Sequence, residues 1–257
     1  MVRLCANYAP RGPGLQIMNK YILVLLVVLG APSLGAISAL DILKKADEHR
    51  SPAGDFSFVV KASEFKAKKL SKETVYKVFS KEGRYSLIET IYPERMLGRK
   101  LLMKENALWL YLPNVHRPTR VSMQQRLTGE VSNGDIARTN FVDDYTPKLL
   151  GQVKWKKRNV YRLALTAKSA EASYRFIELL VDAKNFFPLH ADFFAISGKK
   201  LKAGEFSEFK NVLGKMRSTR FVVTDALQAD RYTRLDYSRF HKESLSESFF
   251  NKESIVD

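Results

Sequence analysis

A two-residue period in hydrophobicity runs through most of the chain from residue 56 to residue 240. In the segment DFSFVVKASEF the large apolar residues fall on every second position, as expected for a strand whose side chains point alternately to two faces of a sheet. Short turn signals such as Lys81-Glu82-Gly83 and Ser197-Gly198 separate about eleven segments of this kind. Because most neighbours are joined by short turns, the sequence predicts a mainly β protein built as one antiparallel meander.

Only two segments have a convincing helical pattern. LDILKKADEHR, from Leu40 to Arg50, places Leu40, Leu43 and Ala46 at helical spacing and is followed by Ser-Pro-Ala-Gly, which ends a helix. A second short helix is predicted over residues 243–251. Two helices are too few to cover the outer face of a large sheet.

The segment ALWLYLP is apolar on both faces. Leu108, Leu110 and Leu112 share one face, and Trp109 and Tyr111 share the other. FVV, FIELLV and ADFFAI have the same character, whereas a half-exposed strand shows a polar face to water. Two explanations remain open at this point: a barrel core with a covered outer face, or a concave face that lines an apolar cavity for a ligand.

The first 39 residues predict a targeting segment rather than part of the fold. MNKYILVLLVVLGAPSLGAISA, from Met18, has a basic start, a short apolar run and small residues near Ser38 and Ala39, which is typical of a cleaved signal peptide. Met18 is the expected true start, and an uncleaved anchor is the alternative. Because the only cysteine is Cys5, residues 40–257 have no thiol, and export without disulfides favours a bacterial periplasm.

The chain is basic, with a formal net charge of +16. Residues 1–39 carry Arg3, Arg11 and Lys20 and no acidic residue, so residues 40–257 keep a net charge of +13. Such a charge favours anionic partners, and for an exported protein phospholipid headgroups or acidic proteins are better candidates than nucleic acid. A merely soluble basic surface is the competing interpretation.

No pattern of residues predicts catalysis. The four histidines are scattered without ligand spacing, and the nucleophile, zinc-protease and phosphate-loop motifs are all missing from the sequence. His190 and Asp192 share a strand face and could form a dyad or two metal ligands, but an ordinary surface pair is the simpler interpretation. The sequence therefore predicts no enzyme, no cofactor and no metal.

Several features together resemble one family. They are the signal peptide, ILKKADEHR, ALWLYLP followed closely by RPTRVS, and the broken segment GEVSNGDIARTNF before Tyr145. In this combination the chain resembles the outer-membrane lipoprotein-sorting proteins related to LolA, over roughly Leu40 to Asn251. The resemblance implies one domain over residues 40–257, a half-open antiparallel barrel closed by a helical lid, and no catalytic residues.

The resemblance also implies a function and partners. Members of this family bind lipid or lipoprotein acyl chains in the periplasm. They work with an inner-membrane transporter, of the ABC type or the resistance-nodulation-division type. Where relatives commonly have a Gly-Ser-Asp-Phe-Ser type run, this chain has Asn133-Gly134-Asp135-Ile136, so lipid and lipoprotein cargo both stay open. The alternative function is a non-enzymatic interaction module of the envelope, for example an accessory subunit of a lipid exporter.

The expected lipid contacts are apolar side chains of the cup and of its lid. We predict that residues 129–145 form a short helix across the cup mouth, capped by Ser132, with Ile136 and Phe141 toward the cavity, and that this helix shifts when lipid enters. The alternative is a static plug that only completes the core. Arg117 and Arg120 are predicted at the rim, where they could meet a headgroup phosphate. The predicted lipid-binding residues are Phe58, Val60, Tyr85, Leu87, Trp109, Tyr111, Met123, Ile136, Phe141, Phe176 and Phe193.

Overall fold

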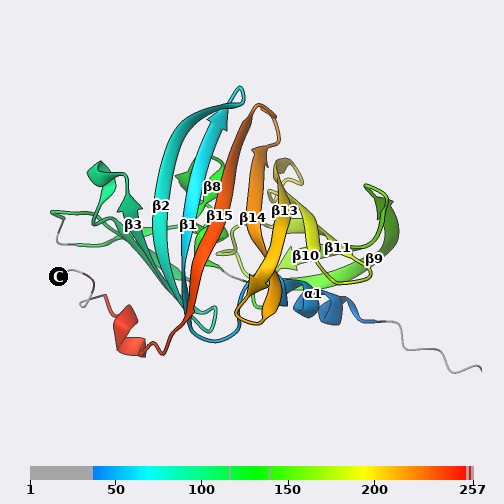
Figure 1. Ribbon diagram of the computed structural model, residues 1–257, viewed down its shortest axis with the longest axis horizontal. Coiled ribbons are helices and arrows are strands. Elements are labelled where there is room, and N and C mark those ends of the chain that lie inside the picture. The colour runs from blue at the N-terminus through cyan, green and yellow to red at the C-terminus, as the bar shows by residue number, and fades with distance from the viewer. Residues whose placement is uncertain (1–36, 116, 139, 253–254, 256–257) are drawn as a thin grey trace, which may run out of the picture. The chain divides into compact units, whose positions relative to one another are not determined.

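A strongly curved antiparallel sheet dominates the structure (Figure 1). The computed structural model describes residues 37–257 except 116, 139, 253, 254, 256 and 257. The strands are β1 (Phe56–Lys66), β2 (Lys69–Lys81), β3 (Tyr85–Tyr92), β4 (Lys100–Lys104), β5 (Ala107–Tyr111), β6 (Thr119–Val121), β7 (Arg126–Thr128), β8 (Val131–Ser132), β9 (Tyr145–Trp155), β10 (Arg158–Ala167), β11 (Phe176–Asp182), β12 (Pro188–Phe194), β13 (Lys200–Val212), β14 (Lys215–Asp225) and β15 (Arg231–Lys242).

Thirteen of these strands form one sheet in the order β6-β5-β4-β3-β2-β1-β15-β14-β13-β12-β11-β10-β9, and β7 pairs with β8 alone. Every neighbouring pair in the large sheet is consecutive in the chain except β1 and β15, which pair at its centre. Because β6 and β9 are not joined, the barrel is half open, and the predicted fold class is confirmed. The estimate of eleven strands was too low, since two- and three-residue strands such as β6, β7 and β8 are too short to show a period.

The first helix agrees with the sequence analysis except in its buried face. Helix α1 (Ala39–Glu48) begins at Ser38, whose hydroxyl accepts a hydrogen bond from the amide of Asp41 at 3.0 Å, an ordinary N-cap. Ile42, Leu43 and Ala46 are fully buried, while Leu40, which we expected on that face, is 41% exposed. The signal-peptide prediction concerns residues that lie almost entirely outside the described ones and stays a prediction.

The broken segment before Tyr145 contains the helix that we predicted to be capped by Ser132. Helix α2 (Asn133–Ala137) follows β8, and Ser132 and Asp135 form a capping box at its start. Hydrogen bonds from the amide of Glu130 to Thr233 (2.9 Å) and from Thr128 to Glu64 (2.5 Å) tie this part of the chain to β15 and β1. We call residues 131–145, that is β8, α2 and the loop to β9, the cover.

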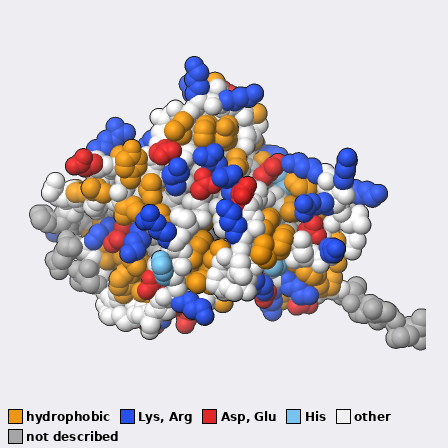
Figure 2. All heavy atoms as spheres, in the orientation of Figure 1, with side chains coloured by type: hydrophobic (Ala, Val, Ile, Leu, Met, Phe, Trp, Pro, Cys, Tyr) orange, Lys and Arg blue, Asp and Glu red, His pale blue; other side chains and the backbone are white. Residues whose placement is uncertain are grey.

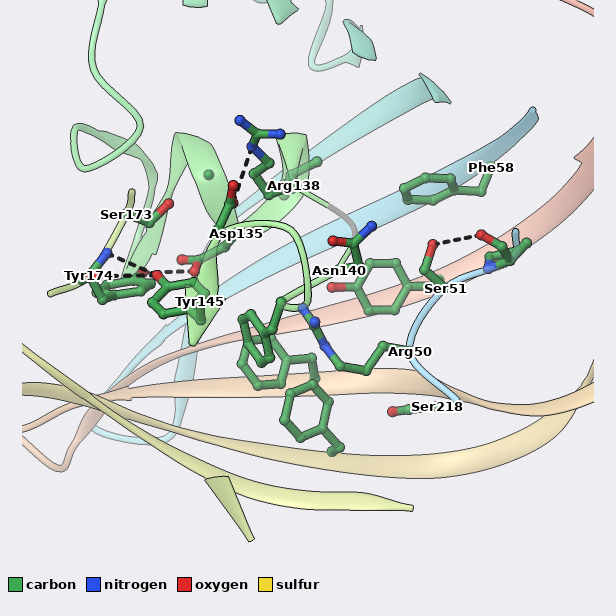
Figure 3. Close-up of a pocket in the computed structure, with 18 of the residues that line it drawn as sticks. Arg50, Ser51, Phe58, Asp135, Arg138, Asn140, Tyr145, Ser173, Tyr174 and Ser218 are labelled. Atoms are coloured by element: carbon green, nitrogen blue, oxygen red, sulfur yellow. Dashed lines mark hydrogen bonds and ion pairs between the residues drawn. The ribbon is translucent and has the colours of Figure 1, made fainter. Parts of the chain in front are cut away.

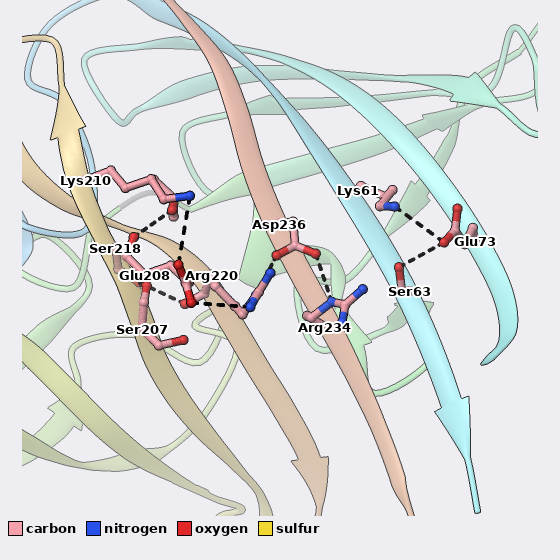
Figure 4. Close-up of polar contacts among 11 residues, drawn as sticks. Lys61, Ser63, Glu73, Ser207, Glu208, Lys210, Ser218, Arg220, Arg234 and Asp236 are labelled. Carbon is pink, nitrogen blue, oxygen red and sulfur yellow. Dashed lines mark hydrogen bonds and ion pairs between the residues drawn. The ribbon is translucent and has the colours of Figure 1, made fainter. Parts of the chain in front are cut away.

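The two faces of the sheet differ in what they bury. The inner face, the cover and α1 form one large apolar cluster that includes Phe58, Val60, Met123, Ile136 and Phe193. The outer face of the central strands is instead charged (Figure 4): Arg220 on β14 contacts Asp236 on β15 at 2.7 Å, and Lys61 on β1 lies 3.5 Å from Glu73 on β2. The central strands therefore meet water directly and need no helices over them.

Strand β5 is apolar on both faces because its outer face packs against the C-terminal end of the chain. Leu108 packs in the inner cluster, whereas Trp109 and Tyr111 belong to a separate outer cluster with Phe250 and Ile255. Phe250 is completely buried and lies in a 3-10 helix, η2 (Glu247–Phe250). A shorter one, η1 (Glu94–Met96), follows β3. The C-terminal segment thus covers β3 to β5 from outside.

Candidate functional site: an aromatic cavity beneath a short helix

A narrow cavity lies between the inner face of the sheet and the cover (Figure 3). Its volume is about 70 Å³, well below the roughly 300–1,000 Å³ of pockets that hold drug-sized ligands. Ten of the 21 residues that line it are aromatic: Phe56, Phe58, Phe141, Tyr145, Tyr174, Phe193, Phe206, Phe221, Tyr237 and Phe240. Such rings give broad apolar contact without demanding one ligand shape, so the wall is chemically suited to apolar groups.

A glycine in β13 makes room for the rings. A Cβ added at Gly204 would lie 2.4 Å from the ring of Phe221 and 3.2 Å from the ring of Phe193. Phe221 also stacks on Phe206 with 4.4 Å between ring centres. The sheet therefore accepts a glycine in mid-strand, ordinarily a weak strand residue, because two rings occupy the space of its side chain.

Buried polar contacts hold helix α2 over the cavity. Lys202 of β13 places its Nζ 2.6 Å from Oδ2 of Asp135 and 2.9 Å from the carbonyl of Glu130. The hydroxyl of Tyr174 donates to Oδ1 of Asp135 at 2.7 Å, and Ser132 donates to Oδ2 through its amide and its hydroxyl. Burial and the nearby Asp135 carboxylate raise the pKa of Tyr174, so Tyr174 stays a donor. We call Asp135, Lys202 and Tyr174 the latch.

The far end of the cover contacts Asp47 in the last turn of α1 and Arg50 just after the helix. Asp47 accepts hydrogen bonds from the amides of Phe141 (2.7 Å) and Val142 (2.8 Å) and pairs with Arg50 at 2.7 Å. The guanidinium of Arg50 lies 3.5 Å from the ring centre of Phe141, a cation–π contact. The cover is therefore attached at both ends through polar groups.

Asp47 should give this attachment a pH dependence. Burial raises the pKa of Asp47, and Arg50 opposes the shift without cancelling it. A raised folded-state pKa means that the folded protein binds the proton more tightly. Protonated Asp47 therefore stabilises the folded protein fully when the pH is below the ordinary pKa of an aspartate. This stabilisation is lost as the pH rises through the raised pKa of Asp47 in the folded protein. We expect the wild type to gain stability relative to Asp47→Asn as pH falls from about 7 to about 4, measured by urea unfolding. A relative loss over that range would mean that Arg50 and the two amides outweigh burial.

A second, wider pocket adjoins the aromatic cavity. Its volume is about 620 Å³, and it shares Ser173 and Tyr174 with the cavity, so these two residues form the wall between them. Ile196, Leu201 and Lys202 line its other side. The latch residue Tyr174 therefore lies between the narrow aromatic cavity and the wider pocket.

The structure brings together about half of the residues predicted from sequence. The cavity is lined by Phe58 and Phe193 from the sheet and by Ile136 and Phe141 from the cover. The two cover residues face the cavity, as predicted for a segment that lies across it. Val60 and Met123 belong to the same inner cluster but not to the cavity wall. Whether the cover shifts when a ligand enters stays a prediction.

Five predicted contacts are on the wrong face. Tyr85, Leu87, Trp109 and Tyr111 lie in the outer cluster under the C-terminal segment, and Phe176 is 37% exposed. In β3 and β5 the neighbours Ile88 and Leu108 face inward instead. The prediction assigned each of these strands the opposite facing. This is equivalent to a shift of one residue along the strand, which exchanges its two faces.

The predicted rim arginines are also misplaced. Arg120 pairs with Trp109 across β5 and β6 and stacks over its ring at 5.4 Å, so it lies on the outer face. Arg117 is exposed in the turn before β6 and is absent from the cavity wall. The cations beside the cavity are Arg50 and Arg138. Sequence reasoning missed both, although Arg50 sits where α1 ends and Arg138 where α2 ends.

His190 and Asp192 form the expected pair but no metal site. His190 Nε2 lies 2.9 Å from Asp192, which also contacts Lys200 at 2.6 Å. Burial alone would raise the pKa of Asp192, but the hydrogen bonds from His190 and Lys200 lower it. Among the residues that the structure describes, no three His, Cys, Asp or Glu side chains gather as a metal site. Within the same residues, no helix is long and apolar enough to cross a membrane.

Comparison with known proteins identifies the family. A family model described as "Uncharacterized protein" matches residues 82–257, and a search of curated proteins finds no match. An outer membrane lipoprotein-sorting protein domain from Vibrio parahaemolyticus is 21% identical, with a TM-score of 0.73 over 85% of this chain and 98% of its own. A DUF1329 family protein from Desulfovibrio piger is 23% identical, with a TM-score of 0.72 over 84% and 97%.

A third solved structure is similar in sequence as well as in fold. It is a LolA superfamily protein from Nitrosomonas europaea, 37% identical, with a TM-score of 0.81, and the match covers 85% of this chain and 100% of the other. Identity at this level over the whole of that protein goes beyond a shared fold. The chain belongs to the LolA superfamily.

Proposed function

We propose that this protein is a periplasmic carrier that takes up the acyl chains of a lipid or lipoprotein between its sheet and its cover. The observation that supports this most directly is the aromatic cavity closed by α2. Burying one methylene gains about 0.8 kcal/mol, so a lipid tail crosses water slowly unless it is shielded. A carrier must shield the tail and also release it, which favours a space that opens over a rigid pocket.

The location and partners follow from the same proposal. The predicted signal peptide and the lipoprotein-sorting description of the Vibrio relative support a periplasmic protein that carries cargo toward the outer membrane. An inner-membrane transporter, of the ABC or the resistance-nodulation-division type, would load it. Mass spectrometry of lipid extracted from protein purified from its native envelope would identify the cargo. Protein that is always empty and takes up no fluorescent fatty acid would favour the envelope interaction module instead.

Cross-linking α2 to its neighbour tests the need for opening. A Cβ at Gly134 would lie 3.1 Å from the Cβ of Ser173. This is slightly less than the separation of about 3.5–4.5 Å found in disulfides, so a small local shift would admit the bridge. Residues 40–257 contain no cysteine, so Gly134→Cys with Ser173→Cys would form a single internal bridge. We expect uptake of a fluorescent fatty acid to fall at least about tenfold when this variant is oxidised and to recover with reductant, because the bridge fixes α2 over the cavity.

The single variant Ser173→Cys serves as the matched control and should bind equally with and without reductant. Equal uptake by the oxidised and reduced double variant, with the bridge verified by mass, would show that α2 does not control access to the cavity.

A further inference from the structure

We propose that neighbouring turns at one end of the central strands form a docking surface for an anionic lipid bilayer. The turn between β12 and β13 (residues 195–199) and the turn between β14 and β15 (residues 226–230) are neighbours. The amide of Ala226 donates to the carbonyl of Leu201 at 3.1 Å. We call these two turns, together with Leu201, the rim. The proposal deepens the proposed function, because it names the surface at which the carrier would meet its lipid source or destination.

The rim exposes large apolar side chains that a soluble protein has no need to expose. Ile196 is 83% exposed, Leu227 is 74% exposed and Leu201 is 42% exposed. Single exposed apolar residues are common, but a group on adjoining turns marks an interaction site. The first two are the most exposed of the large apolar residues that the structure describes.

The two turns hold these side chains outward. The amide of Gly198 donates to the carbonyl of Ala195 at 3.0 Å, and the amide of Ala195 donates to the carbonyl of Lys199 at 3.0 Å. In the other turn the carboxylate of Asp225 accepts from the amides of Leu227 (2.7 Å) and Gln228 (2.8 Å). Because the backbone of both turns is hydrogen-bonded in this way, Ile196 and Leu227 cannot fold back onto the protein cheaply.

Basic residues lie in the rim and on the hairpin beside it, against one exposed acidic residue of the rim, Asp230. Lys199 is exposed, and in the neighbouring β1–β2 hairpin Lys66, Lys68 and Lys69 are exposed beside Leu70, which is 53% exposed. Lys66 pairs with Arg231, so this hairpin adjoins the β14–β15 turn. Blue side chains gather at the tip of the β1–β2 hairpin in Figure 2, with orange ones below them.

The charge around the rim and the neighbouring β1–β2 hairpin suits an anionic bilayer better than it suits a protein partner of ordinary composition. Among the described residues, Lys66, Lys68, Lys69 and Lys199 form no ion pair, so their charges are available to a ligand. Apolar residues on protruding turns, flanked by free lysines, suit the interface of a bilayer. There the apolar groups enter the headgroup region and the lysines contact anionic lipid.

One part of the rim, residues 195–197 with Leu201, borders the wider pocket. Ile196 and Leu201 line that pocket, and Tyr174 on its inner side borders the aromatic cavity. A carrier docked through the rim would therefore present a path from the bilayer to the cavity, and Tyr174 would be the barrier along it.

Vesicle flotation tests the proposal. We expect the wild type to float with vesicles of phosphatidylglycerol and phosphatidylethanolamine, to float less at high salt, and to bind phosphatidylcholine vesicles weakly. Ile196→Ser with Leu227→Ser should weaken binding at least about tenfold, and Lys68→Glu with Lys199→Glu should remove most of the preference for anionic vesicles.

Matched variants on the β9–β10 hairpin control for lost apolar surface and lost charge. Leu150 and Val153 are 46% and 42% exposed, and Lys154 and Lys157 are exposed nearby. Leu150→Ser with Val153→Ser, and Lys154→Glu with Lys157→Glu, should float like the wild type. The proposal is overturned if the wild type does not bind anionic vesicles, or if the control pairs lose as much as the rim pairs.

Uptake of a soluble fluorescent fatty acid, measured without vesicles, separates this proposal from the proposed function. Leu227→Ser alone, and Lys68→Glu with Lys199→Glu, change residues outside both pockets and should keep full uptake while they lose flotation. A wild type that floats but takes up no fatty acid would contradict the carrier function and leave the docking surface standing.

Discussion

Replacing Lys202 with methionine is expected to lower the free energy of unfolding by about 3–5 kcal/mol, since this removes one partner of a buried ion pair. The Lys202 and Asp135 side chains are only 9% and 5% exposed. Methionine fills the space of the lysine stem but leaves the Asp135 carboxylate without its counter-ion. Urea unfolding of the wild type and the variant under the same conditions measures the difference.

A double variant separates the loss of charge pairing from the loss of packing. In Lys202→Met with Asp135→Asn no charge is left unpaired, and the amide oxygen can accept from Tyr174 or from the amide of Ser132, but not from both. Part of the lost stability should therefore return, and the double-mutant cycle should show a large coupling. If Lys202→Met alone costs less than about 1 kcal/mol, as exposed pairs do, water reaches the latch and α2 is held by apolar contacts instead.

Phe250→Ala is expected to cost about 3 kcal/mol, at the lower end of the range for truncating a buried phenylalanine. Phe250 is fully buried among Tyr85, Leu87, Leu102 and Tyr111, and its ring lies 5.7 Å from that of Tyr85. The low end applies because a terminal segment can detach rather than leave an empty cavity. Detachment would expose the outer cluster, so the variant should also bind a hydrophobic dye more strongly.

The neighbouring residue supplies the control. Phe249 is half-buried and contacts Phe79 edge to face at 5.2 Å, so Phe249→Ala should cost clearly less and bind less dye. Equal costs for the two variants would mean that the C-terminal segment makes no specific contact with β3 to β5.

The sequence predicted the elements well because their signals are local. The α1 residues lie at helical spacing, and the cap of α2 is contained in the few residues from Ser132 to Asp135. Alternating apolar residues marked the long strands for the same reason. The class of fold and the position of the cover could therefore be predicted without a structure.

The facing of the strands and the contacts of the site could not be predicted, because they depend on distant residues. Trp109 is partly buried by the C-terminal segment, about 140 positions later, and nothing in ALWLYLP encodes that contact. Lys202 and Asp135 lie 67 positions apart, so the latch has no sequence signature either. In a strand that is apolar on both faces, the sequence predicts that a side chain is buried. It does not predict whether that side chain lies on the inner or the outer face of the sheet.

The pairing of β1 with β15 at the centre of the sheet has a consequence for how the chain folds. Strands β2 to β6 and strands β9 to β14 are each joined by short connections and can form early as separate local sheets. The central pair, which joins Phe56 to Lys242, must wait until nearly the whole chain has been made and must close the longest loop in the molecule. Contacts of such large sequence separation slow folding. The middle of the sheet, although it is flanked by strands on both sides, is thus expected to be the last part to form.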